Sequence, residues 1–420
     1  MGVLLFTHPA DHLRAEDWPG FRGLNGMGVT SEKGLPLDWG GPAGKNVMWK
    51  AALPPTTHEG VPDHNQSSPV VSGGKVYVTT AHWPKGVDQR ANQPAHHVAC
   101  YEAQTGKLLW DKTVPAGPWR LGDLRGGYAA PTPTVSNGRL FTVFGSSIIH
   151  ALDFDGKLLW SHAIGDYNKF DVALPICPLV YKDVVILYLD RNAPAAAILA
   201  LDAATGKVRW EIKRPKTQFS HATPVFTRVR GKQQLIMCAT HALQGINPEN
   251  GEVIWSCNWG QSMWPVSSPV VVGGLVFAIG GRGGHPGMIV DPTGMGDVTA
   301  THLKKRIGPM SEGLSSPVAF GEFVYRINSP GVVRCIRITD GKELFKERLP
   351  GVNPSVSPFV SPEGRVYFAS AGKTVVIEAG PKFKVLAESD LGDGASSSAA
   401  VSDGKIFLKG RKFMYAIGSR

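Results

Sequence analysis

The sequence is poor in cysteine and contains no long apolar stretch. Among its 420 residues there are five cysteines, and none of them are adjacent or fall in a C-x-x-C or C-x-x-C-H spacing: Cys100, Cys177, Cys238, Cys257 and Cys335. This spacing excludes the usual zinc and c-type haem motifs, so we expect buried thiols in the core. No run reaches the roughly 18 apolar residues that a membrane-spanning helix needs, and we therefore expect no transmembrane segment.

Charge is also sparse, and it is not clustered. Only 19% of the residues are Asp, Glu, Lys or Arg, and the formal net charge of +10 is spread over turns and strand ends. Because there is no basic block and no aromatic-interleaved RNA-binding motif, we expect no nucleic-acid partner. The positive excess is compatible with acidic surfaces or anionic ligands. The first residues, MGVLLFTHPADHLRAED, have too short an apolar part for a secretory signal peptide.

What the sequence has in abundance is turn-forming residues, with 50 glycines and 32 prolines. One unit, ALDAATGKVRW at residues 200–210, predicts two short strands joined by a tight turn. In that turn Gly206 takes the positive φ that closes such hairpins. Similar units recur at 100–110, 151–160, 245–255 and 335–345. A recurring hairpin indicates an array of structural repeats.

A Ser/Pro-rich step into an apolar run also recurs, and it gives the number of repeats. The eight copies of this Ser/Pro step are 41 to 64 residues apart, at Pro69, Pro133, Pro178, Pro224, Pro269, Pro317, Pro358 and Ala399. Four short strands per copy at this period predict an all-β fold, an eight-bladed β-propeller of four-stranded blades. The last copy has only three strands, so we expect an N-terminal strand at 47–50 to complete that blade and close the ring.

The tryptophans and the N-terminal region complete the predicted organisation. One Trp per repeat is expected to pack between neighbouring blades: Trp49, Trp110, Trp160, Trp210 and Trp255. We divide the chain into an N-terminal extension over residues 1–45 and a single propeller over residues 46–420. Within the extension, residues 18–28 are expected to form a clasp around the outside of the ring.

The repeat Asp-x-x-Thr-Gly-Lys-x-x-Trp resembles that of the quinoprotein-like propeller family, whose repeats are called PQQ-like. The segments DWPGFRGLNGMGV, LPLDW, NVMWKAALP, GMGDVT and TVVIEAGPKFKVLAESDLG are similar to exported planctomycete-type members. The resemblance covers nearly the whole chain and implies an eight-bladed propeller that is periplasmic or secreted. It fixes no activity, because the class includes dehydrogenases, outer-membrane assembly scaffolds and members of unassigned role. PQQ alcohol dehydrogenases generally carry an adjacent cysteine pair, which this sequence lacks, so PQQ is not the cofactor we expect.

Propeller geometry predicts that the chemically capable residues gather on one face. The A–B and C–D turns share one face and are short and Gly-rich here, whereas the D–A and B–C loops on the other face carry most of the histidines. The longest of these loops, 81–97, contains His82, His96 and His97 and is a candidate lid over the ring. Loop side chains converging over the axis would form a polar pocket with aromatic walls.

We assign candidate roles to residues of these loops. The candidate acid–base residues are His221, His285, Tyr128 and Glu312. The candidate ligand-binding residues are Arg125, Arg191, Arg282, Trp259, Trp264 and Asp190. Four histidines are candidate ligands of a divalent metal: His64, His221, His241 and His285. Beyond that metal hypothesis, the sequence identifies no cofactor.

Three functions stay open at this point. In the first, the protein binds a polar, carbohydrate-like small ligand at the His-rich face, with lyase or hydrolase chemistry as one form of that activity. In the second, it is a non-enzymatic protein-binding scaffold of the outer-membrane assembly type, which needs an exposed apolar or charged rim. The third is a PQQ-dependent dehydrogenase. Whether the protein is an enzyme stays open, and we expect a monomer.

Overall fold

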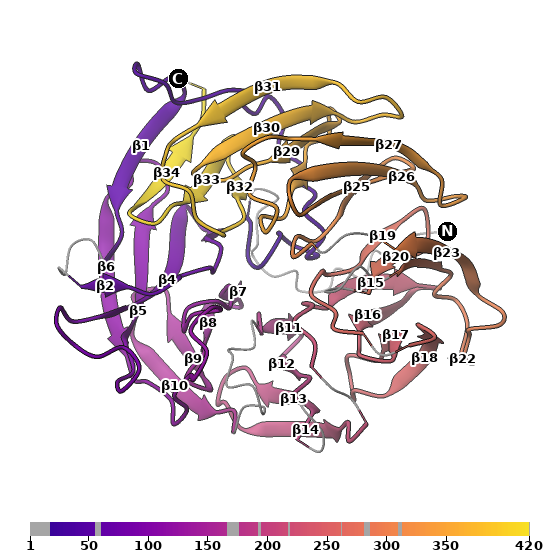
Figure 1. Ribbon diagram of the computed structural model, residues 1–420. Helices are drawn as coiled ribbons and strands as arrows, with labels where there is room; N and C mark the ends of the chain where they lie inside the picture. The colour runs from indigo at the N-terminus through magenta and orange to yellow at the C-terminus, as the bar shows by residue number, and fades with distance from the viewer. Residues whose placement is uncertain are drawn as a thin grey trace, which may run out of the picture.

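Eight small sheets form a closed ring around a central axis, as Figure 1 shows. The computed structural model describes residues 17–54, 60–165, 176–191, 195–216, 219–261, 263–280, 286–309 and 313–419. Each sheet is a four-stranded antiparallel blade, and two blades gain a short fifth strand: β2 (Val61–Pro62) beside β4, and β22 (Gly296–Asp297) beside β18. The predicted all-β, eight-bladed propeller is confirmed.

The blades follow one another along the chain. Blade 1 consists of β3 (Val70–Ser72), β4 (Lys75–Trp83), β5 (Ala95–Glu102) and β6 (Leu108–Val114), and blade 2 of β7 (Thr134–Ser136), β8 (Arg139–Phe144), β9 (Ile148–Asp153) and β10 (Leu158–Ala163). Blade 3 consists of β11 (Leu179–Tyr181), β12 (Val184–Leu189), β13 (Ala197–Asp202) and β14 (Val208–Lys213), and blade 4 of β15 (Val225–Val229), β16 (Lys232–Cys238), β17 (Ala242–Ile246) and β18 (Val253–Asn258). Blade 5 consists of β19 (Val270–Val272), β20 (Leu275–Ile279), β21 (Pro286–Val290) and β23 (Leu303–Pro309). Blade 6 consists of β24 (Val318–Phe320), β25 (Phe323–Asn328), β26 (Val332–Arg337) and β27 (Glu343–Arg348). Blade 7 consists of β28 (Phe359–Val360), β29 (Arg365–Phe368), β30 (Lys373–Glu378) and β31 (Val385–Asp390).

The ring closes through the two ends of the chain. Blade 8 is built from β32 (Ala400–Ser402), β33 (Lys405–Lys409) and β34 (Phe413–Ile417), and its outermost strand is β1 (Val47–Ala52). Lys50 of β1 lies opposite Tyr415 of β34 in an antiparallel pair. The prediction that an N-terminal strand completes the last blade is therefore confirmed, and this pairing covers the edge of β34 that would otherwise be open.

Neighbouring blades are joined by the repeated tryptophans. The indole nitrogens of three successive blades donate to a turn carbonyl of the next blade, Trp49 to Ala103 at 3.0 Å, Trp110 to Phe154 at 3.1 Å and Trp160 to Ala203 at 3.1 Å. Beside each acceptor the turn glycine lies against the indole ring, and Gly206 leaves the space that Trp160 fills. The predicted inter-blade packing is confirmed, and it explains why Gly and Trp recur together in the repeat.

The N-terminal segment at 18–28, which we call the clasp, crosses one mouth of the central channel. It contacts the inner strands of blades on different sides of the axis, through Trp18 to Val71, Pro19 to Val135, Arg22 to Pro317 and Gly28 to Val360. Its indigo trace lies in the central opening in Figure 1. The expectation that the clasp wraps the outside of the ring was wrong, because its backbone pairs with inner strands instead of outer ones.

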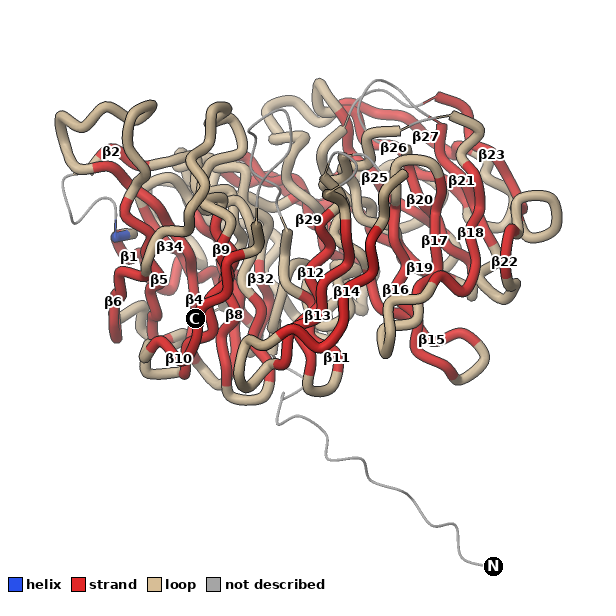
Figure 2. Tube along the Cα trace, turned by 90° about the horizontal axis from the view of Figure 1, so that it is seen from below, coloured by secondary structure: helices blue, strands red, loops and turns tan. Residues whose placement is uncertain are grey.

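The two faces of the ring differ in the length of their connections. Figure 2 shows short turns on one side and longer loops on the other. The predicted lid at 81–97 was wrong, because β4 and β5 pair as far as His82 opposite Ala95. His96 is therefore a buried strand residue whose Nε2 lies 2.7 Å from Ser146 Oγ. The remaining connection packs beside blade 2 through Gln93, which donates to Gly117 O.

No helix in the part of the chain described above is long and apolar enough to cross a membrane.

Candidate functional site

A cavity of about 560 Å³ lies on the propeller axis, and we call it the axial cavity. Phe21 of the clasp contributes to its lining, and most of the wall consists of residues that precede the inner strands of successive blades. Because the clasp crosses the channel on the turn face, we infer that the cavity opens on the loop face. The lining residues Trp264 and Leu314 are 39% and 45% exposed there.

The wall is built from short polar side chains that immediately precede the Pro (or Ala399) of each Ser/Pro step. We call these eight residues the lining ring, and all of them except Ser357 line the axial cavity: Ser68, Thr132, Cys177, Thr223, Ser268, Ser316, Ser357 and Ser398. In most of the ring, a backbone N–H donates to the side chain of the next member. These bonds run from Ser68 to Thr132 at 2.9 Å, Ser268 to Ser316 at 2.9 Å, Ser316 to Ser357 at 2.9 Å, Ser357 to Ser398 at 3.0 Å and Ser398 to Ser68 at 3.1 Å.

The lining ring changes between blades 3 and 5. Cys177 replaces the hydroxyl in blade 3, and burial raises the pKa of its thiol while a hydrogen bond with Thr223 opposes that rise. Ser268 Oγ is buried and has no hydrogen-bond partner within the described ranges. Leaving a buried hydroxyl unsatisfied costs about 1–3 kcal/mol. A polar group of a ligand bound at this point would recover that free energy.

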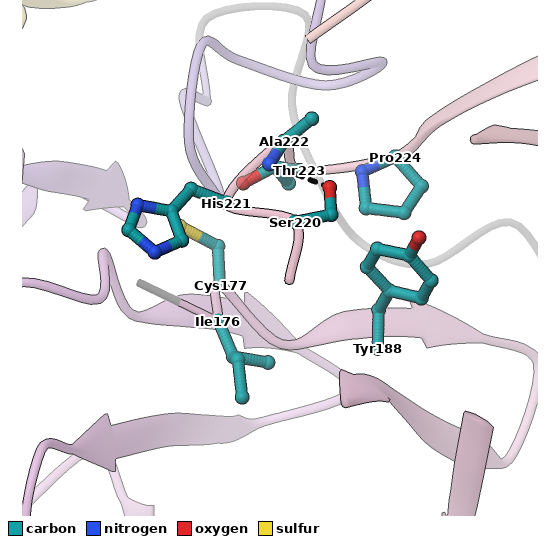
Figure 3. A pocket seen from close by; sticks show the side chains of 8 residues that line it. All are labelled: Ile176, Cys177, Tyr188, Ser220, His221, Ala222, Thr223 and Pro224. Carbon is teal, nitrogen blue, oxygen red and sulfur yellow. Dashed lines mark hydrogen bonds between the residues drawn. The ribbon is translucent and has the colours of Figure 1, made fainter. Parts of the chain in front are cut away.

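An aromatic wall lies at the same side of the cavity. The rings of Phe219 and His221 are 4.2 Å apart between centroids, and those of Phe219 and Trp264 are 6.0 Å apart. The backbone N–H of His221 donates to Pro265 O at 2.8 Å and holds this loop in place. Figure 3 shows the imidazole of His221 beside the sulfur of Cys177. An imidazole, a thiol and an aromatic surface thus lie together where the lining ring changes.

The charged residues of the cavity lining form one exposed pair. Arg125 Nε donates to both carboxylate oxygens of Asp123, at 3.0 and 2.9 Å. The Arg125 side chain is 76% exposed and that of Asp123 is 23% exposed. Because the two charges neutralise each other, the pair adds little net charge to the cavity.

Three of the predicted site residues line the axial cavity, namely Arg125, His221 and Trp264. Tyr128 lies instead in the core between blades, where its hydroxyl accepts the Leu121 N–H at 2.9 Å. Trp259 is also buried, and its indole nitrogen donates to Ala239 O at 2.9 Å.

The predicted residues Asp190 and Arg191 lie in a buried polar network of blade 3. Arg214 Nε donates to Asp190 Oδ1 at 2.9 Å, and the Tyr188 hydroxyl donates to the same carboxylate. Burial raises the pKa of Asp190, and Arg214 opposes that rise. Arg191 donates to Ile164 O at 3.1 Å. Arg214 also donates to Gln244 Oε1 at 3.0 Å, so the network joins blades 3 and 4 and satisfies the buried carboxylate of Asp190.

The predicted metal ligands are not brought together among the residues that can be examined. His64 and His241 are exposed and do not line the axial cavity, in contrast to His221. No group of three or more His, Cys, Asp or Glu within the described ranges could hold a metal ion. The predicted residues His285, Glu312 and Arg282 lie outside those ranges.

Sequence reasoning missed the lining ring and the basic residues behind it. The signal for the ring was present, because a Ser, Thr or Cys precedes the Pro of the first seven Ser/Pro steps and a Ser precedes Ala399 in the eighth. Lys409 and Arg326 each lie five residues after a turn glycine, at the position that Thr79 occupies in blade 1. Both side chains are fully or almost fully buried. In the sequence, the sign that these two positions differ from that of Thr79 was a basic residue on a middle strand of a blade.

Comparisons with known proteins agree with this architecture. The family model described as "Outer membrane protein assembly factor BamB" matches residues 94–347. A tetrathionate hydrolase from Acidithiobacillus ferrooxidans is 25% identical over 190 residues, which make up 43% of this chain and 36% of that protein. The match to that relative thus spans about a third of its length.

Two solved structures show the same fold at low identity. BamB from Moraxella catarrhalis has a TM-score of 0.58 at 12% identity, over 88% of this chain and 99% of that one. A europium-containing methanol dehydrogenase has a TM-score of 0.65 at 14% identity, over 94% of this chain and 89% of that one. At these identities the likeness concerns the fold alone.

The fold and the cavity define an eight-bladed propeller with one axial cavity of the size of a small-molecule site. Because the family model covers more than half of the sequence, the chain belongs to the PQQ-like propeller family. The closer resemblance to planctomycete-type members stays a prediction.

Proposed function

We propose that the axial cavity binds a polar, carbohydrate-like small ligand. The observation that carries the proposal is the pairing of a hydroxyl-lined wall with an aromatic surface in one cavity of about 560 Å³. Pockets of roughly 300–1,000 Å³ are typical of small-ligand sites. Hydroxyl groups can donate and accept hydrogen bonds, and aromatic faces pack against apolar C–H surfaces, so the two together suit a sugar-like molecule.

Within this proposal His221 is the candidate acid–base residue. Its imidazole lies against Phe219 at the cavity and beside Cys177 (Figure 3). An imidazole can take up or release a proton near neutral pH, which is what a lyase or hydrolase requires. Ligand binding does not depend on that chemistry, so binding and turnover are tested separately. We also propose a periplasmic or secreted location, since the family model describes an outer-membrane assembly factor.

A protein-binding scaffold is the second candidate. It is favoured by the similarity to BamB and by exposed apolar residues on the outer strands of two adjacent blades, Leu108 and Leu109 on β6 and Leu158 and Leu159 on β10. Such a rim is what a protein partner would cover. PQQ fits less well, because none of the five cysteines forms a disulfide and no group of three or more His, Cys, Asp or Glu within the described ranges could hold the accompanying metal ion.

The proposal is tested by thermal shift against a saccharide panel with and without divalent metals. The panel should raise the melting temperature of the wild type, and Trp264→Ala should remove that rise because it deletes the aromatic wall. Met295→Ala, which truncates an 83% exposed side chain outside the cavity, is the matched control and should behave like the wild type. His221→Ala separates binding from turnover. A wild type that responds no differently from Trp264→Ala to every ligand would refute the proposed site.

A further inference from the structure

Lys409 and Arg22 are two of the buried basic residues near the wall of the axial cavity. Lys409, at the end of β33, is 1% exposed and donates from Nζ to Ser67 Oγ at 2.7 Å and to Thr79 O at 3.2 Å. Arg22 of the clasp is 2% exposed, and its guanidinium donates to three carbonyl oxygens, those of Gly26 at 3.1 Å, Met27 at 2.9 Å and Pro317. All of these acceptors are uncharged.

Neither cation pairs with a carboxylate within the described ranges. Burial lowers the pKa of Lys409 to about 7 and that of Arg22 to about 9. Taking a charged group out of water is costly unless an opposite charge compensates it. In their protonated forms, which a bound anion would favour, two such groups held only by neutral dipoles leave an uncompensated positive potential around them.

The positions of these cations direct that potential into the cavity. Lys409 bonds to Ser67, which immediately precedes the lining residue Ser68. Arg22 follows the lining residue Phe21. Its acceptor Pro317 follows the lining residue Ser316. Each charged group thus bonds to a residue that is the sequence neighbour of a lining residue, and screening between buried groups is weak.

The charged pair in the lining does not cancel this potential. Among the lining residues within the described ranges, Asp123 is the only carboxylate, and it is already paired with Arg125. The charged lining residues together with Lys409 and Arg22 therefore carry a net positive charge.

The lining ring presents hydrogen-bond donors to the lumen. Ser68, Ser316 and Ser398 each accept a backbone N–H from the preceding member of the ring. A hydroxyl whose oxygen accepts an N–H still has its own proton available to donate. The accepted bond also polarises the O–H group, which makes the hydroxyl a better donor. Ser268 Oγ adds a buried hydroxyl that has no partner within the described ranges. A wall that offers donors suits a ligand group that only accepts.

We propose that the ligand of the axial cavity is an oxyanion, a small molecule whose carboxylate, sulfate or phosphate group is held by the hydroxyls of the lining ring and balanced in charge by Lys409 and Arg22. The inference rests on the proposed function and narrows its ligand from carbohydrate-like to acidic. Charge-assisted hydrogen bonds are stronger than neutral ones, so the acidic form of a sugar is the preferred ligand.

The test is isothermal titration of the full chain with glucuronate, glucose and inorganic sulfate at constant ionic strength. Glucuronate should bind about tenfold or more tightly than glucose, and sulfate should compete with it, because an added charge interacts with the buried cations. Lys409→Met should lower the affinity for glucuronate about tenfold and leave that for glucose unchanged. The matched control is Lys384→Met, which removes the same charge from an exposed residue paired with Glu378.

Circular dichroism verifies that each variant is folded, and Arg22→Met replaces Lys409→Met if the latter is not. The ratio of the wild-type affinities for glucuronate and glucose tests the charge inference without any variant. Glucose that binds as tightly as glucuronate, or a Lys409→Met change that weakens both equally, would overturn the charge inference and leave the proposed site intact. Binding by none of the three, or binding that Trp264→Ala does not affect, would overturn the proposed site as well.

Discussion

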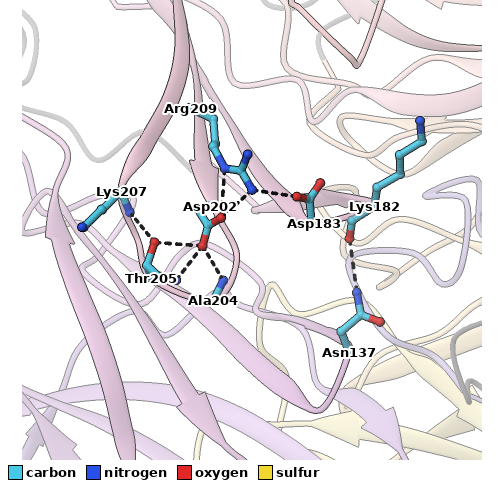
Figure 4. Close-up of polar contacts among 8 residues, drawn as sticks. All are labelled: Asn137, Lys182, Asp183, Asp202, Ala204, Thr205, Lys207 and Arg209. Carbon is cyan, nitrogen blue, oxygen red and sulfur yellow. Dashed lines mark hydrogen bonds and ion pairs between the residues drawn. The ribbon is translucent and has the colours of Figure 1, made fainter.

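The contact between a turn glycine and the tryptophan of the preceding blade predicts how the ring responds to a single methyl group. Gly206 has φ 70°. A Cβ added there would lie 2.5 Å from a ring carbon of Trp160. Figure 4 shows that the same turn is held by Asp202, whose Oδ1 accepts the Thr205 N–H at 2.8 Å. Because the turn is fixed by these bonds, it cannot move away from the indole without losing them.

The substitution Gly206→Ala should therefore destabilise the protein through two separable effects. An alanine at positive φ costs about 1–2 kcal/mol, and overpacking against a buried ring costs about 1–3 kcal/mol more. Gly274→Ala is the matched control, since Gly274 has φ 77° and nothing within 4 Å of an added Cβ. We expect Gly274→Ala to show the first effect only.

Urea denaturation followed by tryptophan fluorescence measures both variants. Gly206→Ala should lower the free energy of unfolding by about 2–5 kcal/mol and Gly274→Ala by about 1–2 kcal/mol. Adding Trp160→Ala to Gly206→Ala should cost less than the sum of the single changes, because the clash is then gone. Equal effects of the two glycine substitutions would refute the proposed role of the glycine as the receptor for the indole.

Three further predictions concern buried polar groups. Burial lowers the pKa of His96 to about 3 and that of His150 to about 4, both below the unfolded value of about 6.5. Their neutral forms therefore contribute stability that is complete above about pH 6.5 and is lost as the pH falls toward those values. The midpoint of urea denaturation should decline from pH 8 to pH 4. If His150→Gln showed the same dependence of the midpoint on pH as the wild type, this explanation would be contradicted. Asp190→Asn should cost about 3–5 kcal/mol of stability, because it leaves Arg214 buried without its carboxylate. The ligand affinity of the folded protein should not change. The control is Asp403→Asn, which alters an exposed ion pair. Ser268→Ala should leave the free energy of unfolding unchanged or raise it by about 1 kcal/mol while weakening ligand binding, and a loss of stability without a loss of affinity would argue against a ligand contact there.

The architecture could be predicted from the sequence because its signals repeat. Gly206 and Trp160 belong to a unit that recurs along the chain, so a single misjudged residue did not change the number of blades. The strand at 47–50 was identified by the same repeat, since it ends the incomplete last blade.

The site could be predicted only in part, because loop residues were judged by their chemistry and not by their packing. His221 and Trp264 follow their predicted positions near the axis. Tyr128 and Asp190 come from the same kinds of loop, but their polar atoms are taken up by neighbouring blades. No local pattern distinguishes a loop residue that faces the axis from one that packs between blades, because that difference depends on contacts across the ring.

The path of the clasp also could not be predicted from the sequence. The sequence of residues 18–28 contains no repeat that relates it to a blade, and its path across the channel depends on backbone pairing with several inner strands. The place of Phe21 in the cavity lining, and of Arg22 beside it, therefore follows only from the three-dimensional structure.

The most direct test of the account is a crystal structure of the protein soaked with glucuronate. The account predicts the sugar inside the axial cavity, with its carboxylate held by hydroxyls of the lining ring and its ring beside Trp264. A sugar bound at the outer strands, or a cavity that stays free of glucuronate at concentrations where titration shows binding, would contradict it.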